Sequence, residues 1–451
     1  MAYVPLTDVD LANKTVIMRV DFNSPVETTE RRWALRSTKR IDDHIRTTFI
    51  SLFKSENSPR NIVVIAHQGR FGQSDCTTLR RHFEHCRDEL KPHDIRVFYP
   101  WESIDDAAVE SMGEKAVASD EVLHHIRELP DRSILILENV RFSKSEGDTE
   151  NGKEPEDFAN HALIRMLSRV DKRIAALDGF SVAHRAQASV IGLKNLGEHL
   201  YAGPVVMREI DHLANALVKP KRPMVLVVGG AKIDDSLRAI RRFLGNNTAD
   251  RVLTGGLVGL AFLYAQSYPD EPFNKPTLDN LAQSCKDLSR TRRVVEELLA
   301  DEGEKILVPT DLAVGPNSGQ IFDRTTYRVG DPALKTTPHA VGDIGIRTIS
   351  QYVPFITEAQ TIVMNGPMGR YEWKNFSLGT EEVLRFVACT AHGWHAHALI
   401  GGGDTGAALE AGSIPYNQEV VECSSGKAFL QALASGTLRN LAGIRALART
   451  E

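Results

Sequence analysis

Short runs of Val, Ile and Leu recur along this chain, and each is followed by a glycine or polar turn and then by a longer helix-like segment. The clearest runs are TVIMRV (15–20), NIVVIAH (61–67), SILILENV (133–140), RIAALDGF (173–180), PMVLVVGG (223–230), RVLTGG (251–256), KILVPTD (305–311), TIVMNGP (361–367) and HALIGGG (397–403). Continuous apolar runs of this length are typical of strands buried on both faces, and their alternation with helices indicates parallel β-α-β units. We therefore expect an α/β protein.

The length of 451 residues favours two lobes, because one hydrophobic core rarely organises so long a chain. Runs occur before and after residue 200, so each half can build its own sheet. Between the halves, apolar residues recur at helical spacing with prolines at both ends of the segment: Val206, Ile210, Leu213 and Leu217. We expect two Rossmann-like lobes, 1–200 and 201–437, joined by a hinge helix at 203–219 that belongs to the second lobe.

Composition excludes several classes of protein. Lys and Arg number 54 against 59 Asp and Glu, a net charge of −5 without a basic block, so bulk nucleic-acid binding is not indicated. No apolar run reaches the ~20 residues that a membrane span requires. The five cysteines are scattered, and the start of the chain lacks the pattern of a signal peptide. We therefore interpret the chain as a cytoplasmic protein in which any anion site is local.

Basic and polar side chains follow the strands of the first half. They are Asp21 and Asn23, His67 and Arg70, Arg141, and His184 with Arg185, and Arg40 lies in a neighbouring segment. Ligands of open parallel sheets bind at the carboxyl ends of the strands. Guanidinium groups bind carboxylate and phosphate through paired hydrogen bonds, and arginines gathered at one edge repel one another without an anion. The pattern predicts a site for a phosphorylated acid; alternatively, each arginine pairs with a nearby acid on the surface.

Glycines follow the strands of the second half. The motifs are GGAK (229–232), GG (255–256), NGPMG (365–369) and GGGDT (401–405). Glycine lets backbone N–H groups approach a phosphate, and a helix starting near Thr405 would direct its positive end at that anion. Lys232 adds a cation and Asp404 a carboxylate, as expected around a magnesium-bound polyphosphate. These turns predict a nucleotide site and therefore a kinase, unless the glycines serve only tight turns.

The same glycines also allow a rival interpretation. Gly401, Gly403 and Gly406 fit the GxGxxG fingerprint of dinucleotide binding, and an acid follows at Glu419 or Glu422. A dehydrogenase would leave the arginine-rich first half unexplained, so we rank it lower. The chain has no Walker A pattern, which disfavours a P-loop NTPase.

The order and spacing of these motifs resemble those of phosphoglycerate kinase along almost the whole chain. The similar motifs are VDFNSP, the Arg40 segment, AHQGR, LENVRF, AHRAQAS, GGAK, MNGPMGRYE and GGGDT, and TKRIDDHI and GGAKIDDS look archaeal. The resemblance implies a two-lobed, monomeric glycolytic or gluconeogenic enzyme that transfers a phosphoryl group between ATP and the carboxylate of 3-phosphoglycerate, giving 1,3-bisphosphoglycerate and ADP. The acid would bind to the N-terminal lobe, and ATP or ADP with Mg²⁺ to the C-terminal lobe.

The resemblance also assigns roles to residues. The acid-binding residues would be Asp21, Asn23, Arg40, His67, Arg70, Arg141 and Arg185. The nucleotide-binding residues would be Gly230, Lys232, Gly255, Asn365, Glu372, Gly401, Gly402, Gly403, Asp404 and Thr405, with Glu372 at the ribose and Asp404 at the metal. The catalytic residues would be Arg40, Lys232, Gly403 and Lys427. The C-terminal tail, 438–451, would fold back onto the first lobe.

Two positions depart from the family's pattern. Ser236 stands where bacterial and eukaryotic members have a second lysine, and Ser425, Gly426 and Lys427 replace a late run of three glycines. Lys427 is predicted to supply the missing cation, because transition-state charge can be met from either side. Alternatively, its side chain blocks the turn, leaving a paralogue for another acid or a catalytically silent nucleotide-binding protein. A kinase for a hydroxyl group, with Asp21 as base, is a further alternative.

Overall fold

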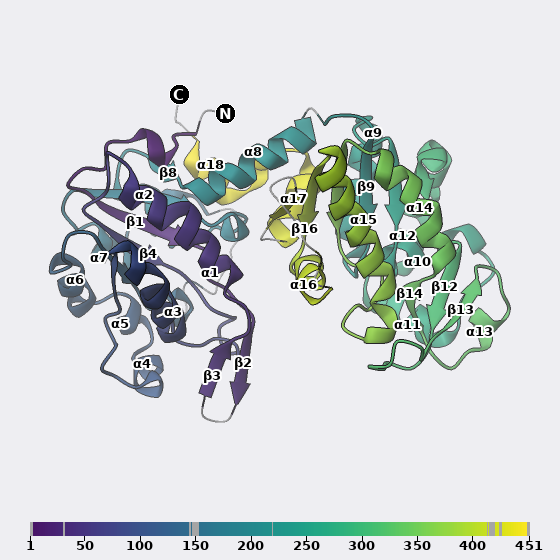
Figure 1. Cartoon of the computed structure of the whole chain (residues 1–451), viewed down its shortest axis with the longest axis horizontal. Helices are drawn as coiled ribbons and strands as arrows, with labels where there is room; N and C mark the ends of the chain where they lie inside the picture. Colours follow the sequence, from purple (N-terminus) through teal and green to yellow (C-terminus); the bar gives the residue numbers. More distant parts are fainter. Residues whose placement is uncertain are drawn as a thin grey trace. The chain divides into compact units, whose positions relative to one another are not determined.

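The computed structural model describes residues 3–29, 32–143, 146, 153–218, 220–412, 414, 420–423 and 426–448. The chain forms two compact units (Figure 1): unit 1 is Met1–Ile210 with Leu438–Glu451, and unit 2 is Asp211–Thr437. The division falls within helix α8 (Pro204–Val218), which we expected to belong wholly to the second lobe. Its first turn is held by unit 1, because Asp178 accepts hydrogen bonds from the backbone N–H groups of Val205 and Val206.

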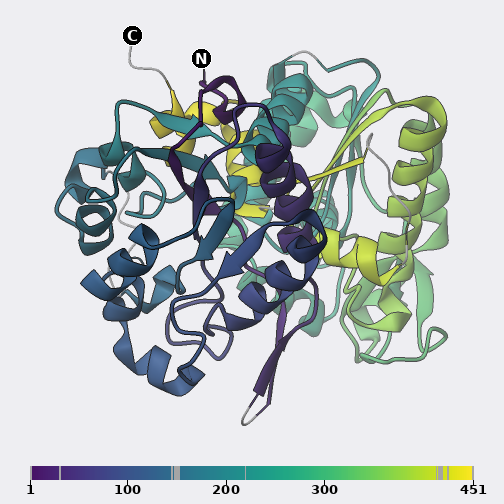
Figure 2. The same cartoon turned by 60° about the vertical axis from the view of Figure 1, so that its left-hand side comes forward.

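Unit 1 is built on a six-stranded parallel sheet. In spatial order its strands are β5 (Arg96–Phe98), β6 (Ser133–Ile136), β4 (Asn61–Ile65), β1 (Thr15–Val20), β7 (Arg173–Asp178) and β8 (Leu200–Ala202). Every residue of β1, β4 and β6 is buried, which explains their continuous apolar runs. A separate antiparallel pair, β2 (Val26–Thr29) and β3 (Arg32–Leu35), projects from this sheet in Figure 2.

Helices follow the strands of unit 1. They are α1 (Lys39–His44), α2 (Ile50–Lys54), α3 (Arg80–Leu90), α4 (Asp106–Met112), α5 (Glu114–Val117), α6 (Asp120–Arg127), α7 (Ala162–Leu167) and the C-terminal α18 (Ala442–Leu447). A π-helical segment, Ile45–Phe49, joins α1 to α2. The C-terminal residues pack on this unit, since the N–H of Gly443 donates to the carbonyl oxygen of Ala183 at 2.7 Å.

Unit 2 contains a second six-stranded parallel sheet. In spatial order its strands are β11 (Ile306–Leu307), β10 (Arg251–Thr254), β9 (Met224–Val228), β15 (Thr361–Asn365), β16 (His397–Gly401) and β17 (Val420–Cys423). Numbered in chain order, these strands run 3-2-1-4-5-6 across the sheet. This doubly wound order places a ligand crevice where the order reverses, at the carboxyl ends of β9 and β15.

The run KILVPTD, predicted as one strand, is divided in the structure. Strand β11 ends before Pro309, which has no N–H with which to extend a ladder. The chain then enters a small antiparallel sheet that the sequence pattern did not reveal. Its strands, in spatial order, are β13 (Thr325–Arg328), β12 (Asp311–Val314) and β14 (Val341–Ile344).

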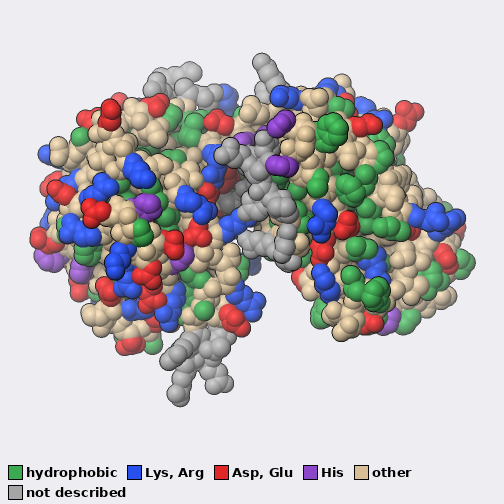
Figure 3. All heavy atoms as spheres, in the orientation of Figure 1, with side chains coloured by type: hydrophobic (Ala, Val, Ile, Leu, Met, Phe, Trp, Pro, Cys, Tyr) green, Lys and Arg blue, Asp and Glu red, His purple; other side chains and the backbone are tan. Residues whose placement is uncertain are grey.

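The helices of unit 2 are α9 (Ile233–Gly245), α10 (Gly256–Ser267), α11 (Lys275–Gln283), α12 (Leu288–Glu302), α13 (Ala333–Thr336), α14 (Ile346–Glu358), α15 (Leu378–Trp394), α16 (Gly403–Ala411) and α17 (Gly426–Ser435). Tyr352 of α14 and Leu384 of α15 belong to one buried cluster with Met364 and Ile400 of the sheet. Among the described helices, none combines the length and apolar character needed to cross a bilayer. On the face drawn in Figure 3, basic and acidic side chains are interspersed over each unit.

Candidate active site

Most of the residues predicted to bind the acid follow strands that lie side by side in unit 1. In spatial order these are Arg141 after β6, His67 and Arg70 after β4, Asp21 and Asn23 after β1, and Arg185 after β7. Because parallel strands end at one edge of their sheet, these residues come to the same edge. Arg40 reaches it from α1, and its Nη1 donates to Asp21 Oδ2 at 2.9 Å. We call this set of residues the arginine edge.

Asp21 lies at the centre of the arginine edge and is 3% exposed. Its Oδ2 accepts the hydrogen bond from Arg40, and its Oδ1 accepts one from the N–H of Asn23 at 3.2 Å. The Oδ1 of Asn23 accepts in turn from the N–H of Gly69 at 2.8 Å. Gly69 has a φ of +68°, and a Cβ there would lie 2.1 Å from the carbonyl oxygen of Asp75, so this turn requires glycine.

Two buried residues behind Asp21 were missed by the sequence patterns. The N–H of Asp21 donates to His44 Nε2 at 3.1 Å, and His44 Nδ1 lies 3.1 Å from Asp178 Oδ2. Because Nε2 accepts a hydrogen bond, the ring donates to Asp178 from Nδ1. The other oxygen of Asp178 accepts from the N–H groups of Val205 at 2.8 Å and Val206 at 3.2 Å. One carboxylate therefore connects the arginine edge to the first turn of α8.

His67 is held as a neutral hydrogen-bond donor. Its Nδ1 lies 2.9 Å from Nη2 of Arg19, and since a guanidinium only donates, the ring proton is on Nε2. Burial, together with the positive charges of Arg19 and Arg141, lowers the pKa of His67 well below its ordinary value. Arg19 is 1% exposed and lies inside β1, so its position in the sequence is that of a core residue. Burial lowers the pKa of Arg19 to about 10, and the nearby Glu146 carboxylate opposes that shift.

The remaining arginines of the arginine edge form no ion pair with a carboxylate of the described residues. Within the described part of the chain, no carboxylate lies within ion-pair distance of Arg70, Arg141 or Arg185. Arg141 is only 6% exposed, and its burial lowers the pKa of the guanidinium. The Nε of Arg185 is buried without a hydrogen-bond partner. Arg185 is half-buried and Arg70 is exposed. Guanidinium groups that lack a paired carboxylate favour an anionic ligand with several oxygen atoms.

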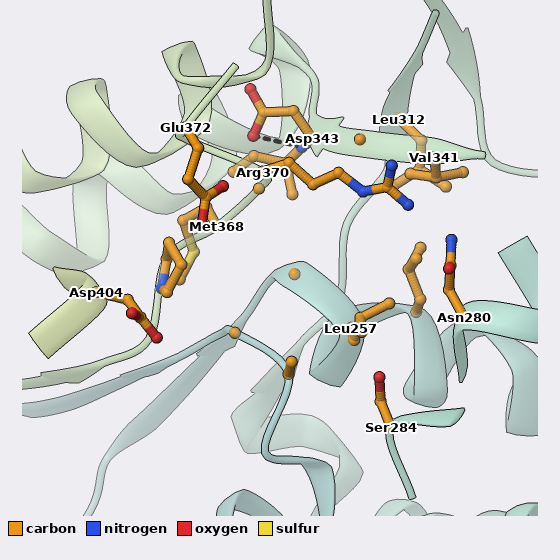
Figure 4. A pocket seen from close by; sticks show the side chains of 18 of the residues that line it. Leu257, Asn280, Ser284, Leu312, Val341, Asp343, Met368, Arg370, Glu372 and Asp404 are labelled. Atoms are coloured by element: carbon orange, nitrogen blue, oxygen red, sulfur yellow. Dashed lines mark hydrogen bonds between the residues drawn. The ribbon is translucent and has the colours of Figure 1, made fainter. Parts of the chain in front are cut away.

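Unit 2 has a pocket of about 310 Å³ at the carboxyl ends of β9 and β15, the predicted crevice of the sheet (Figure 4). Glycine turns, apolar side chains and a few polar groups surround it. Its lining residues include Gly230, Ala231, Gly256, Leu257, Leu260, Asn280, Ser284, Leu312, Val341, Met368, Gly369, Arg370, Glu372 and Asp404. Three residues predicted to bind the nucleotide, Gly230, Glu372 and Asp404, thus line one pocket. The predicted Gly255 does not; it packs against Met368, and Gly256 lines the pocket instead.

The turns around this pocket depend on the absence of side chains. Gly366 has a φ of +85°, and a Cβ there would lie 2.4 Å from the carbonyl oxygen of Gly229. The N–H of Gly366 donates to Thr405 Oγ1 at 3.0 Å, which ties the turn after β15 to the start of α16. Asn365 Oδ1 is buried without a partner and lies 3.5 Å from the position of a Cβ on Gly402. The predicted residues Asn365, Gly402 and Thr405 therefore lie together, beside Gly401 and Gly403.

Lys232 lies at the border of the pocket rather than in its lining. It occupies the N-cap position of α9 and lines a neighbouring cavity of about 780 Å³, which shares Ala231 and Ser284 with the first. Ser236 of the same helix is fully buried, and its hydroxyl has no hydrogen-bond partner among the described groups. Ser425 and the side chain of Lys427 lie outside the described residues, and Gly426 begins α17.

The residues present fit a magnesium ion that is held largely by a ligand. Asp404 is exposed in the first turn of α16 and lines the pocket with Glu372. Burial raises the pKa of the neighbouring Tyr371 phenol to about 12, and the negative charges of Asp404 and Glu372 add to that shift. Among the described residues, no three His, Cys, Asp or Glu side chains form a metal cage. Magnesium in kinases takes one or two carboxylates and completes its shell with phosphates and water.

Comparison with known proteins identifies the family of this chain. The family model described as "Phosphoglycerate kinase" matches residues 6–436. The phosphoglycerate kinase of Thermoplasma volcanium is 30% identical over 428 residues, which cover 95% of this chain and 93% of that protein. That of Methanothermus fervidus is 32% identical over 438 residues, covering 96% and 94%. The crystal structure of phosphoglycerate kinase from Pyrococcus horikoshii aligns with a TM-score of 0.81 and 28% identity over 98% of both chains. The chain belongs to the phosphoglycerate kinase family.

Proposed function

We propose that unit 1 binds 3-phosphoglycerate at the arginine edge and that unit 2 binds ATP or ADP in its glycine-lined pocket, so that a phosphoryl group passes between the nucleotide and the acid's carboxylate. Family membership supports the reaction, and the arginine edge carries the assignment of the acid. Arg70, Arg141 and Arg185 lack described carboxylate partners, whereas 3-phosphoglycerate has a phosphate and a carboxylate. Arginine forks bind both groups through paired hydrogen bonds.

Phosphoryl transfer to a carboxylate requires positioning and charge neutralisation rather than a general base. Neutral His67 would donate Nε2–H to an oxygen of the acid, because Arg19 occupies its Nδ1. Both oxygens of Asp21 are already engaged by Arg40 and Asn23. This arrangement supports a positioning role for Asp21 and disfavours a hydroxyl acceptor, which would need a free base.

In unit 2 the phosphates would meet backbone N–H groups at the start of α16, including those of Gly403 and Asp404, as expected of a helix N-terminus. Glu372 would bind the ribose, and Lys232 would contact the phosphoryl group in transfer. Asp404 would hold Mg²⁺, which supplies neutralising charge on the phosphates. Helix α8 is the proposed hinge, since residues of both units belong to it.

The first test is ADP formation from MgATP, with and without 3-phosphoglycerate, on the purified chain. We expect turnover that depends on the acid. Arg141→Met should raise the KM for 3-phosphoglycerate by roughly 10- to 150-fold, because it removes a charged hydrogen bond, and should leave the KM for ATP near its original value. Arg60→Met is the matched control, because Arg60 forms an exposed pair with Asp131 in the same unit. Nucleotide binding without acid-dependent turnover would contradict the proposal.

The late turn has a separate test. We propose that Lys427 supplies charge to the phosphoryl group that passes between the substrates. Lys427→Ala should then lower kcat by 10-fold or more at saturating substrates, the size of effect expected when one transition-state contact is removed. Lys335→Ala, at an exposed lysine of the same unit that lines neither cavity, is the control. An unchanged kcat in Lys427→Ala would leave the turn a tolerated variation.

The cellular setting is also a proposal: a monomer that works in the cytoplasm. Its support is that the described cysteines, Cys76, Cys86, Cys285 and Cys389, are free thiols, as a reducing compartment favours. Light scattering across a range of protein concentrations tests the monomer, because a mass that rises above 49.9 kDa would contradict it.

A further inference from the structure

Helix α1 brings Arg40 to the arginine edge. Arg40 Nη1 donates to Asp21 Oδ2 and to the carbonyl oxygen of Asn23, both at 2.9 Å. His44, four residues later and so on the same face of the helix, accepts a hydrogen bond from the N–H of Asp21 at 3.1 Å. The position of α1 therefore decides where the guanidinium of Arg40 can meet a ligand.

Helix α1 depends on contacts from elsewhere in the fold to keep that position. It has six residues and then passes into the π-helical segment Ile45–Phe49. Thr38, at its N-cap, donates its hydroxyl to Asp42 Oδ2 at 2.8 Å and accepts no hydrogen bond from a backbone N–H of the helix. Helices this short are not stable on their own in water, so tertiary contacts must hold α1.

Arg208 of α8 supplies such a contact. Its Nη1 donates to Asp43 Oδ1 at 3.0 Å and to Thr47 Oγ1 at 3.1 Å, and its Nη2 donates to Asp43 Oδ2. Thr47 Oγ1 donates in turn to Asp43 Oδ1 at 3.0 Å. Thr47 lies in the π-helical segment, and turns of this kind are frequent at functional sites. The planar fork of an arginine fits both oxygens of one carboxylate, so the pair fixes the orientation of α1 as well as its distance from α8.

The ion pair between Asp43 and Arg208 is electrostatically favourable. The two side chains are only partly exposed, at 35% and 38%. Burial alone would raise the pKa of Asp43, but the hydrogen bond and the positive charge of Arg208 hold that pKa below its ordinary value. Burial alone would lower the pKa of Arg208, but the hydrogen bond and the negative charge of Asp43 raise it. The two shifts agree that each group stabilises the charged form of the other.

We propose that Arg208 is a positioning residue for the acid: it holds Asp43 so that α1 places Arg40 correctly at the arginine edge. Asp178 already links the first turn of α8 to His44, and Arg208 adds a link to α1 one helical turn later. Arg208 itself does not touch the acid and acts through Arg40. The inference rests on the proposed function, because it assumes that the acid binds at the arginine edge.

The test measures kcat/KM for 3-phosphoglycerate at saturating MgATP. Arg208→Met keeps most of the length of the side chain and removes the fork. We expect a loss of at least about 5-fold and up to roughly 100-fold, the loss that a misplacement of about 1 Å can cause. Calorimetry should show ADP affinity unchanged, because the nucleotide pocket lies in unit 2. Arg208→Lys keeps the charge and should recover part of the loss. Arg169→Met is the matched control, because Arg169 forms an exposed pair with Asp120 in the same unit.

A double-mutant cycle with Arg40 separates positioning from a general loss of structure. In a chain that already carries Arg40→Met, the further change Arg208→Met should lower kcat/KM by no more than about 2-fold, because the group through which Arg208 acts is gone. Damage to the fold of unit 1 would instead cost the full factor in both backgrounds. That result, or an unchanged kcat/KM in Arg208→Met alone, would overturn the inference. If Arg208→Met does not fold, Asp43→Asn, which keeps the shape of its side chain and removes the charge, enters the same cycle.

Failure of the proposed function is a distinguishable result. If the wild-type chain shows no acid-dependent turnover, calorimetry of 3-phosphoglycerate binding still tests the inference. Weaker binding of the acid to Arg208→Met than to the wild type, with ADP affinity unchanged, supports the positioning role even then. Equal affinities for the acid, or no binding of the acid to the wild type, reject it.

Discussion

The two units of this molecule share a six-stranded parallel sheet but present different groups to their proposed ligands. The arginine edge of unit 1 consists of side chains, in which guanidinium groups and a neutral imidazole surround Asp21. The pocket of unit 2 consists of turns in which backbone atoms come so close that a Cβ at Gly366 would meet the carbonyl oxygen of Gly229 at 2.4 Å. Unit 1 should therefore lose affinity gradually as single contacts are removed, whereas unit 2 should fail abruptly when a turn is forced open.

The largest expected effect comes from forcing a turn open. Gly366→Ala places a Cβ against Gly229 at a φ of +85°, so the turn after β15 must move. We expect ADP affinity to fall at least 100-fold and the free energy of unfolding to fall by on the order of 3–5 kcal/mol. Calorimetry and urea unfolding measure the two effects. Gly303→Ala is the control, because nothing lies within 4 Å of a Cβ there. Similar ADP affinities and similar free energies of unfolding in the two variants would contradict the expectation that unit 2 fails abruptly when a turn is forced open.

A second experiment compares buried carboxylates that cap a helix in each unit. Asp178 caps α8 in unit 1, and Asp311 caps α14 in unit 2 through the N–H groups of Arg347 at 3.1 Å and Thr348 at 2.9 Å. Substitution of either by Asn should cost about 2–4 kcal/mol of unfolding free energy, since an amide donor replaces an acceptor in a buried site. Only Asp178→Asn should also raise the KM for 3-phosphoglycerate, because Asp178 holds His44 behind Asp21. Equal KM values in the two variants would argue against that connection.

The smallest expected effect concerns acid sensitivity. Burial lowers the pKa of His82 in unit 1 from its ordinary value of 6.5 to about 3. Below pH 6.5 the unfolded chain therefore binds a proton at His82 that the folded protein does not bind. The stability contributed by neutral His82 is complete above pH 7 and is lost as pH falls, by about 1.4 kcal/mol at pH 5.5.

His82→Gln should remove that pH-dependent loss in urea unfolding at pH 7.5 and 5.5, because Gln still donates to the carbonyl oxygen of Phe22, which lies 3.1 Å from His82 Nε2. The comparison in unit 2 is His397→Gln. The pKa of His397 is lowered to about 4 by burial and by His212, but the residue is only half-buried, so a smaller change is expected. An unaltered pH dependence in His82→Gln would show that the acid sensitivity arises elsewhere.

Much of the fold could be predicted because the central strands of both sheets are buried on both faces and so read as apolar runs. The edge strands β5 and β8 span three residues each, too few to produce a run. The antiparallel sheet of unit 2 escaped prediction because Asp311 and Thr325 interrupt apolar continuity, and Pro309 divides a run that looked like one strand. Pattern reasoning therefore succeeds where burial is complete on both faces.

The residues of the candidate site also differ in whether the sequence could predict them. Residues in the turns after buried strands, such as Arg141 and Asp404, could be proposed for the site from their position in the sequence. Arg19 could not, because it lies inside a strand among core residues, and neither could Asn280, which comes from a helix distant in sequence. A pattern of two glycines does not reveal which one has a left-handed φ, here +54° at Gly256, so it could not predict that Gly256 rather than Gly255 lines the pocket.

The carboxylate of Asp178 holds two parts of the molecule in place, the histidine behind Asp21 and the start of α8. This one group is hydrogen-bonded to the first turn of α8 and to His44, which itself accepts a hydrogen bond from the N–H of Asp21. Thermodynamic linkage then makes their energies inseparable: whatever tightens His44 on Asp178 also changes how firmly α8 is anchored, and the reverse holds by the same amount. Sequence change at the arginine edge and at the start of α8 is therefore constrained jointly, and substitutions in one of these places should be tolerated best when matched by substitutions in the other.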